Sequence, residues 1–262
     1  MHRASFKAEY RKISGMENRI FTGSNRYVFV AGDLHGDYDS FCKITRMHSK
    51  HVKDSLLLYL GDYADRGPMG VEIITELNNL LHMRDDIVAL KGNHEIYKNR
   101  KPEFFPCDLI HQAELKNNSW DSFYNEVFSD FLNKLHIAAI INNVLFIHAG
   151  VFSGITGITD LTNKENEKYL LWSDPSPKPG EHMSVRGGGV EFGEDVTERV
   201  LSALGLKLII RSHEPRKAGS GPFEEHGGRI ITTNACNSYG ESWRPFILKV
   251  DTENLGYETI YL

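Results

Sequence analysis

The sequence is poor in cysteine and contains no long apolar run. Three cysteines occur in 262 residues, Cys42, Cys107 and Cys236, and no two of them are closely spaced. This spacing predicts neither a disulfide framework nor a structural zinc site with thiolate ligands. Because unpaired thiols are typical of a reducing compartment, we expect a cytoplasmic location. No apolar stretch reaches the length of a transmembrane helix.

The chain also lacks an excess of positive charge. Its formal net charge is −5, so the whole-molecule field does not favour nucleic acid or an anionic membrane, and we expect neither as a partner. Residues 1–26 are basic but lack the apolar core of a secretory signal, which predicts a leader that is partly ordered at most. No linker rich in proline, glycine or serine divides the remainder, which favours a single domain over residues 27–262.

Strands and helices alternate in the first third of the chain. Apolar runs predict strands at 27–31, 55–60 and 87–91, and the stretches between them predict helices near 38–51 and 69–82. Such β-α-β units pair parallel strands through right-handed crossovers, and their ligands bind outside the carboxyl ends of the strands. A site is therefore expected just after each strand.

The rest of the chain is less regular. Residues 99–119 are polar and irregular and residues 120–135 favour a helix, which together indicate a helical insertion of about residues 99–135. Asn142-Asn143 lies between two apolar runs and predicts a β-hairpin over 137–147. A further helix is predicted at 194–204, and further strands at 206–210, 229–233, 244–250 and 257–261. The last three strands suggest a second, mostly antiparallel sheet.

Three short blocks follow the three predicted strands. They read GDLHG at 32–36, GDYADRG at 61–67 and GNHE at 92–95. Each block contains side chains that bind metal ions, and the candidates are Asp33, His35, Asp62 and Asn93. Residues two apart at the end of a strand project from the same face, so the Asp and the His of the first block can reach one ion. Three such blocks in this order are not a chance occurrence.

These residue types suit a pair of metal ions. Two divalent ions about 3.5–4 Å apart can hold a shared hydroxide as nucleophile and clamp the oxygens of an in-line phosphoryl displacement. Asp62 is the natural bridge between the ions, because its block follows the middle strand. His148 and His213 follow later strands and would complete the second ion. Carboxylate, amide and imidazole ligands without thiolate favour manganese, with iron or zinc as alternatives.

A candidate acid and two candidate phosphate ligands accompany the metal-binding side chains. His94 directly follows the candidate ligand Asn93 and is placed to protonate a leaving alkoxide. Asp65 is a suitable partner to hold its imidazole in the donating orientation. Arg66 and Arg186 offer planar guanidinium groups to phosphate oxygens. Catalysis would then consist mostly of positioning and charge stabilisation.

The blocks resemble the PPP family of metal-dependent serine/threonine protein phosphatases, within the calcineurin-like metallophosphoesterase superfamily. The family pattern GDxHG, GDxxDRG, GNHE is matched, and the likeness continues downstream. Residues 170–175 resemble the family's LLWSDP, residues 186–193 its RG…FG stretch, and residues 211–213 its R-x-H. Residues 148–150, HAG, stand where the family has HGG. The likeness covers about residues 27–250.

This resemblance implies a fold and a site. The implied fold is α/β, with four α/β/β/α layers in which a central β-sandwich of mixed sheets is flanked by helices. The implied ligands of one ion are Asp33, His35 and Asp62, and those of the other are Asp62, Asn93, His148 and His213. The remaining implied site residues are the acid pair His94 and Asp65 and the phosphate ligands Arg66 and Arg186. The chain departs from the family after GNHE and at 233–239, which is typical of a prokaryotic-type or divergent member.

Three functions fit the pattern. The first is hydrolysis of phosphoserine and phosphothreonine monoesters on proteins, with phosphotyrosine as a further substrate. The second is hydrolysis of a dinucleoside polyphosphate such as diadenosine tetraphosphate, because those enzymes share the metal blocks; GNHE with an intact DRG favours the phosphatase. A metal-binding scaffold without activity ranks last, because every expected ligand and acid is present.

Five other residues have less specific readings. Asp174 fits a contact behind the site and a turn equally well, and Tyr239 fits substrate contact and packing equally well. Arg211 is expected to form a structural ion pair and Glu95 to be structural, while Trp172 is expected in the core.

Overall fold

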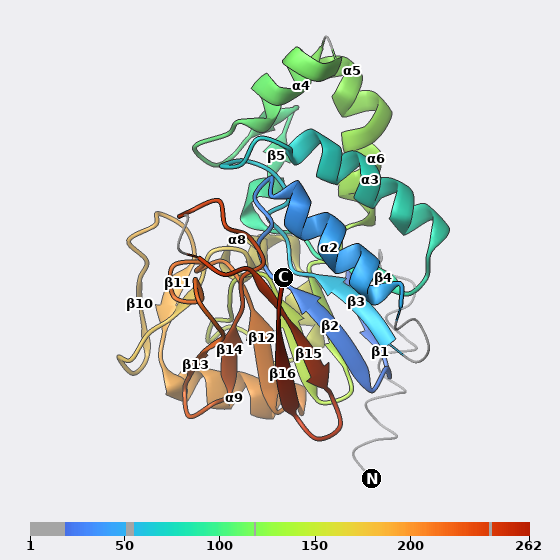
Figure 1. The fold of residues 1–262 in the computed structure, drawn as a ribbon. Coiled ribbons are helices and arrows are strands. Elements are labelled where there is room, and N and C mark those ends of the chain that lie inside the picture. Colours follow the sequence, from blue (N-terminus) through green and yellow to red (C-terminus); the bar gives the residue numbers. More distant parts are fainter. Residues whose placement is uncertain (1–18, 51–54, 118, 241–242) are drawn as a thin grey trace.

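Two β-sheets form the centre of the computed structural model, which describes residues 19–50, 55–117, 119–240 and 243–262 (Figure 1). The first sheet contains, in spatial order, β16 (Gly256–Tyr261), β15 (Phe246–Asp251), β2 (Tyr27–Ala31), β3 (Ser55–Tyr59) and β4 (Ile87–Ala89). The second contains β1 (Ile20–Gly23), β7 (Ala138–Ile141), β8 (Val144–Ile147), β12 (Leu208–Arg211), β14 (Ile230–Thr232) and β13 (Phe223–Glu225).

The first sheet joins the predicted parallel strands to two strands from the C-terminal part of the chain. β2, β3 and β4 run parallel, while β15 lies antiparallel beside β2 and β16 antiparallel beside β15. The prediction that β15 and β16 belong to a second, antiparallel sheet is therefore wrong. β15 packs Leu248 between the sheets and Ile247 on the opposite face, so it covers the edge of β2 with apolar contacts on both faces.

The second sheet is mixed. The predicted hairpin around Asn142-Asn143 forms from β7 and β8, and β8, β12 and β14 run parallel. β1 pairs in parallel with β7, and β13 is antiparallel to β14. Of the predicted leader, residues 1–18 lie outside the described residues, and Ile20–Gly23 is β1.

Helices cover the outer faces of both sheets. On the first sheet lie α2 (Tyr38–His48), α3 (Gly70–Met83), α5 (Trp120–Phe123) and α6 (Ser129–Lys134). On the second lie α7 (Ile158–Thr162), α8 (Glu167–Leu170) and α9 (Glu194–Leu204). A third apolar cluster fills the space between the sheets, with side chains such as Val30 from one sheet and Phe146 from the other. These layers confirm the predicted α/β/β/α class.

The predicted insertion forms the lobe at the top of Figure 1. The prediction of irregular chain over 99–119 is wrong in part, because α4 (Leu109–Asn117) forms there. Its buried apolar residues, Leu109 and Ala113, are one turn apart, which is a weak helical signal among polar neighbours. The π-helical turn η2 (Tyr124–Phe128) connects α5 to α6 within the predicted helix.

The remaining elements are short. They are the 3-10 turns η1 (Asn93–Glu95) and η3 (Lys164–Asn166), the strand pair β5 (Tyr97–Lys98) and β6 (Lys101–Pro102), and the small sheet of β10 (Glu181–Met183), β11 (Val190–Phe192) and β9 (Asp174–Pro175).

The two sheets approach each other closely at the carboxyl ends of their parallel strands. Asp33, which follows β2, pairs with Asn234, which follows β14. A Cβ atom on Gly32 would lie 2.6 Å from the carbonyl oxygen of Thr233, so only glycine permits this approach. Residues that follow strands of both sheets therefore meet at one edge.

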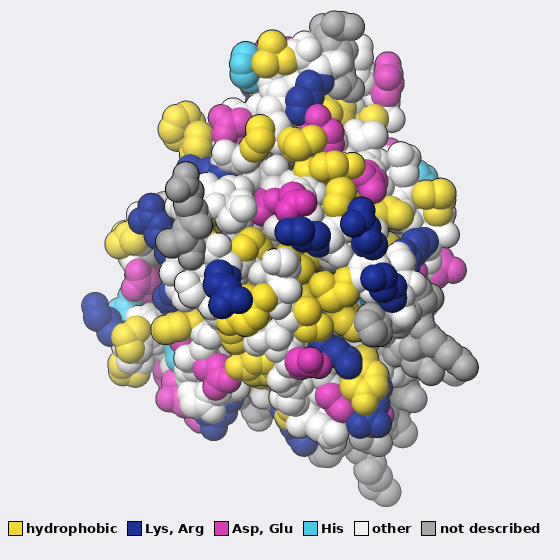
Figure 2. Space-filling view, in the orientation of Figure 1, with side chains coloured by type: hydrophobic (Ala, Val, Ile, Leu, Met, Phe, Trp, Pro, Cys, Tyr) yellow, Lys and Arg dark blue, Asp and Glu magenta, His cyan; other side chains and the backbone are white. Residues whose placement is uncertain are grey.

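The visible surface mixes side chains of every kind. On the face drawn in Figure 2, lysine and arginine side chains are interspersed with acidic and hydrophobic ones. Within the described part of the chain, no helix combines the length and the apolar character needed to cross a bilayer.

Candidate active site

The predicted site residues converge where five strands end. Asp33 and His35 follow β2, Asp62 follows β3, Asn93 lies in η1 after β4, His148 follows β8 and His213 follows β12. All six side chains are buried. The structure therefore brings the two halves of the predicted ligand set together from both sheets.

The backbone adopts an unusual conformation at this edge. Positive φ angles of 42°, 56°, 67°, 69° and 69° occur at His35, Asp62, Asp65, Arg66 and His213. Each such non-glycine residue costs on the order of 1–3 kcal/mol, and these residues cluster at functional sites. A Cβ atom on Gly92 would lie 2.2 Å from Asp62 Oδ1, so the second and third blocks can touch only because this residue is glycine.

The ring of His35 has one nitrogen engaged and the other facing two carboxylates. Its Nδ1–H donates to the carbonyl of Ala64 at 2.9 Å, which leaves the lone pair on Nε2. This Nε2 lies 3.5 Å from Asp62 Oδ2 and 3.8 Å from Asp33 Oδ2. The Tyr239 hydroxyl donates to the same nitrogen at 2.9 Å. Asp33 Oδ2 is buried without a hydrogen-bond partner among the described residues.

A second cluster forms around Asn93. Its Oδ1 lies 2.9 Å from His148 Nε2 and 2.9 Å from His213 Nδ1, and the two ring nitrogens are 3.1 Å apart. His148 Nδ1–H donates to the carbonyl of Leu60, so its Nε2 presents a lone pair to the cluster. Asp62 Oδ1 approaches the same Nε2 at 3.5 Å. Three electron-rich atoms in mutual contact need a shared cation or proton to stabilise them.

Burial keeps the imidazoles neutral. It lowers the pKa of His35 to about 3, and it holds the pKa values of His148 and His213 well below their usual range. Burial also raises the pKa of Asp62 well above its usual range, in spite of the positive charge that His94 contributes nearby. A neutral imidazole is the form that binds a metal, and a cation would supply the charge that these carboxylates need.

The donor set fits metal ions. Two groups of side chains place one candidate ligand atom each within 4.8 Å of one another, namely His35 with Asp62 and His94, and Asp62 with His148 and His213. Both groups contain Asp62, the predicted bridge. The first group includes His94 where Asp33 was predicted. We favour Asp33 as the ligand, because its Oδ2 lacks a partner among the described residues whereas His94 is engaged by Asp65.

His94 and Asp65 form a buried pair. His94 Nδ1–H donates to Asp65 Oδ2 at 2.6 Å. Burial opposes the charged imidazolium, but the carboxylates of Asp62 and Asp65 outweigh it and raise the pKa of His94 to about 9. Burial likewise opposes the Asp65 carboxylate, but the hydrogen bond from His94 prevails and lowers the pKa of Asp65. The ring of His94 lies 4.9 Å from that of His35, so this imidazole is adjacent to a predicted ligand of the first ion.

The two predicted phosphate ligands have different neighbours at the site. The Arg66 guanidinium is placed over the ring of Tyr239, 5.7 Å from its centroid. Arg186 Nε pairs with Asp174 Oδ2 at 2.7 Å, and Asp174 Oδ1 lies 3.9 Å from His213 Nε2. Both arginines are partly exposed, as residues that bind a substrate from solvent must be.

The structure shows the contacts of four residues for which the predictions from sequence were less specific. Asp174 is an ion-pair partner of Arg186 and of the fully buried Arg211, whose expected structural ion pair is present. Glu95 accepts hydrogen bonds from three backbone N–H groups, at Asp62, Tyr63 and Gly92. Trp172 is half-buried and packs against the apolar cluster of the second sheet's outer face, and its ring meets that of His213 edge-on at 5.7 Å, so it lies at the border of the core rather than inside it.

Sequence reasoning missed Asp108, directly before α4, and Gln112 within it, both of which contact the second block. The available signal was Asp108 directly before Leu109, with Ala113 one turn later. This is the pattern of a helix N-terminus with a short apolar stripe.

A family model described as calcineurin-like phosphoesterase matches residues 27–217. Over 242 residues, the chain is 35% identical to a probable serine/threonine-protein phosphatase of Encephalitozoon cuniculi, covering 88% of this chain and 51% of that protein. It is 33% identical over 226 residues to serine/threonine-protein phosphatase 5 of Homo sapiens, covering 81% of this chain and 43% of that protein. The chain thus spans about half the length of the curated relatives it matches.

A solved structure gives the same fold. A protein serine/threonine phosphatase from Saccharomyces cerevisiae, described as similar to a human phosphatase, superposes with a TM-score of 0.77. The alignment covers 99% of this chain and 89% of that one at 23% identity, so the likeness concerns the fold alone.

Proposed function

The chain belongs to the calcineurin-like phosphoesterase family, and from this premise we propose that it hydrolyses phosphoserine and phosphothreonine monoesters on proteins, with phosphotyrosine as a further substrate. One observation carries the proposal. Two buried groups of candidate ligands share Asp62, and one of them contains His94, which is paired with Asp65. The similarity to relatives named serine/threonine phosphatases supports the substrate class.

The metal ligands follow from the two groups. We assign Asp33, His35 and Asp62 to one ion, and Asp62, Asn93, His148 and His213 to the other. Manganese fits these oxygen and nitrogen donors, with iron or zinc as alternatives. When bound, such a pair supplies an activated water and positive charge to the phosphoryl oxygens. The protein's part is to hold the ligands in place. The rings of His35 and His148 are each fixed by a hydrogen bond from Nδ1–H to a backbone carbonyl, which leaves Nε2 free to bind the ion.

The other residues act on the substrate. Arg66 and Arg186 bind the phosphate oxygens and orient the ester. His94 donates its proton to the leaving oxygen of serine or threonine, and Asp65 keeps the ring turned toward it. We place this activity in a single catalytic domain over residues 27–262, together with β1, which joins its second sheet, in a cytoplasmic protein with three free thiols.

A paired assay tests the proposal. Manganese-loaded protein is given a phosphothreonine peptide and, separately, diadenosine tetraphosphate. We expect faster turnover of the peptide, loss of activity with EDTA, and loss in Asp62→Asn. His94→Asn should lower kcat on the peptide by about 10²–10⁴-fold, the usual contribution of a general acid. His111→Asn is the matched control, because this imidazole is exposed on α4.

Each alternative has its own result. Faster cleavage of the dinucleotide would replace the proposal with a dinucleoside polyphosphate hydrolase. If the protein hydrolysed neither compound in a metal-dependent way, the remaining hypothesis would be a metal-binding scaffold without activity. Full activity of His94→Asn on the peptide would remove the general-acid assignment while leaving the metal site intact.

A further inference from the structure

Both oxygens of the Asp65 carboxylate are engaged, and by different parts of the chain. Oδ2 accepts from His94 Nδ1 at 2.6 Å. Oδ1 accepts from the backbone N–H groups of Asp108 and Leu109 at 2.6 and 2.9 Å. These two amides lie at the N-terminus of α4, one directly before the helix and one at its first residue, so this end of the helix fixes the plane of the carboxylate that holds His94.

Two side chains, one directly before α4 and one within it, hold the backbone of the same loop. Asp108 Oδ2 accepts from the N–H of Arg66 at 3.0 Å. Gln112 Oε1 accepts from the N–H of Gly70 at 2.9 Å, and its Nε2 donates to the carbonyl of Gly67 at 3.0 Å. Asp108 and Gln112 thus supply hydrogen-bond partners to three backbone groups between Asp65 and the first residue of α3. A loop with left-handed residues persists only when its surroundings hold it.

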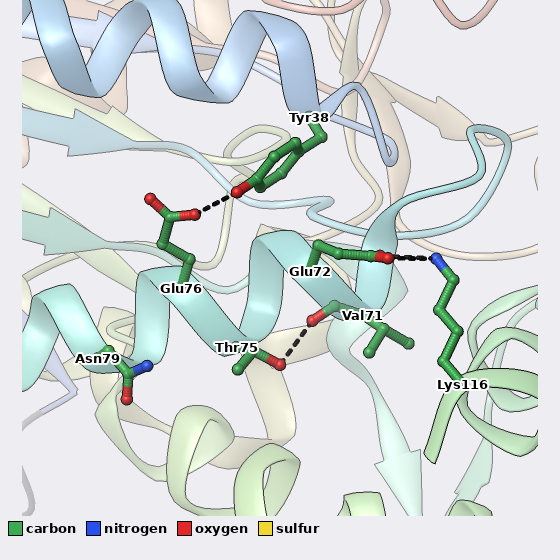
Figure 3. Close-up of a pocket in the computed structure, with 7 residues that line it drawn as sticks. All are labelled: Tyr38, Val71, Glu72, Thr75, Glu76, Asn79 and Lys116. Atoms are coloured by element: carbon green, nitrogen blue, oxygen red, sulfur yellow. Dashed lines mark hydrogen bonds and ion pairs between the residues drawn. The ribbon is translucent and has the colours of Figure 1, made fainter. Parts of the chain in front are cut away.

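The position of α4 is in turn fixed by packing. Leu109 and Ala113 are buried in the same apolar cluster as α3. At its other end, Lys116 reaches Glu72 of α3 at 2.6 Å and the carbonyl of Pro68 at 3.0 Å, and Figure 3 shows the first of these contacts. The helix is therefore held in place by the core and in turn holds the loop that contains Asp65.

We propose that Asp108 and Gln112 are positioning residues, which hold Asp65 and through it His94 in the orientation that protonates the leaving oxygen. The inference rests on the proposed function for its substrate, but its geometry depends only on the contacts above. It gives the predicted insertion a part in the reaction, because both residues lie within that segment.

Substitutions can separate positioning from folding. Gln112→Met keeps the length of a buried side chain and removes both of its hydrogen bonds. Asp108→Ala removes the acceptor for Arg66, whereas Asp108→Asn retains an oxygen and should rescue. Glu114→Gln is the control, because this side chain is exposed on the same helix.

The kinetic test compares leaving groups. A phosphothreonine peptide needs a proton on its leaving oxygen, whereas 2,4-dinitrophenyl phosphate does not. We expect Gln112→Met and Asp108→Ala to lower kcat on the peptide at least tenfold more than on the aryl phosphate, with KM changed less than about twofold. Asp108→Asn and Glu114→Gln should resemble the wild type. Equal losses on both substrates, or no loss on the peptide, would overturn the inference.

A second measurement does not depend on activity. In ¹H NMR of the full chain, the His94 Nδ1 proton should give a low-field resonance that His94→Asn removes. Its exchange with solvent should be at least tenfold faster in Gln112→Met and unchanged in Glu114→Gln. If the wild type cleaved neither substrate, the proposed function would fail, and this exchange rate would still decide the inference. An unchanged rate in Gln112→Met would refute it.

Discussion

At the scale of single residues, Asp174 connects an arginine at the surface of the site to an arginine in the protein interior. Its two oxygens pair with the partly exposed Arg186 and the fully buried Arg211, each at 2.7 Å. Neither partner is adjacent in sequence, which explains why Asp174 fitted a turn equally well. Asp33 and His35 were predicted from sequence to act together, and their side chains do lie 3.8 Å apart, but the left-handed turn at His35, not strand alternation, brings them together.

Asp174→Asn tests this connection. We expect the free energy of unfolding to fall by about 1–3 kcal/mol, because buried Arg211 loses a charged partner. KM for a phosphothreonine peptide should rise about tenfold, because Arg186 loses the anchor that orients it toward phosphate. Urea denaturation and steady-state kinetics measure the two effects. Asp39→Asn, at an exposed residue paired with Lys43, is the control.

The two readouts separate the two roles of Asp174. A loss of stability with unchanged KM would show that the carboxylate supports Arg211 only. A KM effect equal to that of Arg186→Ala would identify the anchoring of Arg186 as its whole contribution to catalysis.

At the scale of elements, the N-terminus of α2 also holds a distant segment. The Asp37 carboxylate caps the helix by accepting from Ser40 N at 3.1 Å and Ser40 Oγ at 2.7 Å. The same side chain accepts from Asn237 N at 3.1 Å, and the segment that it holds contains Tyr239. Asp37 therefore connects α2, the helix that follows the first block, to the segment around 233–239.

Asp37→Ala should affect both partners. Loss of an N-cap costs about 1–2 kcal/mol, and we expect a decrease of this size in the free energy of unfolding. Amide hydrogen exchange of Asn237 should become faster, because its acceptor is gone. Asp37→Ser keeps a capping oxygen and should recover most of the stability but not the slow exchange of Asn237, since its side chain is shorter. Slow exchange of Asn237 in Asp37→Ala would contradict this coupling.

Prediction from sequence succeeds for elements that local pattern defines. The bounds of β2 and α9 match their predicted ranges, because apolar periodicity within each segment sets them. In contrast, the pattern within a strand does not determine which sheet the strand joins. β15 could have paired with any strand that offered an open edge, and its place beside β2 depends on apolar layers formed by the rest of the chain. α4 was missed because its apolar periodicity is weak, although residues 112–116 are good helix formers.

At the scale of the whole molecule, the site requires that two sheets keep their relative position, and Glu167 connects their edges. Its carboxylate pairs with Arg19, directly before β1 of the second sheet, and with Lys91, which follows β4 of the first. Glu167 itself lies in α8, in the outer layer of the second sheet. Lys91 lies two residues before Asn93, and the carbonyl of Leu170 in α8 accepts from the N–H of Ala149, next to His148, so this network of three charged residues borders the segments that carry two ligands of the second group.

Glu167→Gln should therefore change stability in a pH-dependent way. Burial opposes the charged carboxylate, but Lys91 and Arg19 outweigh it and lower the pKa of Glu167 below its usual 4.5. A lowered folded-state pKa contributes stability above the unfolded value and loses it as the pH falls through the folded value. The wild type should exceed the variant by about 1–2 kcal/mol at pH 7, and the gap should close on acidification below about pH 4.5.

Urea denaturation of metal-free protein between pH 3 and pH 8 measures this gap. Glu165→Gln is the matched control, because this neighbouring carboxylate is exposed and its removal should leave the curve unchanged at every pH. Taking the difference between variant and wild type cancels the titration of the buried ligand groups, which both proteins share. A gap of constant size down to pH 3 would mean that the packing of Glu167, not its charge, holds the two edges together.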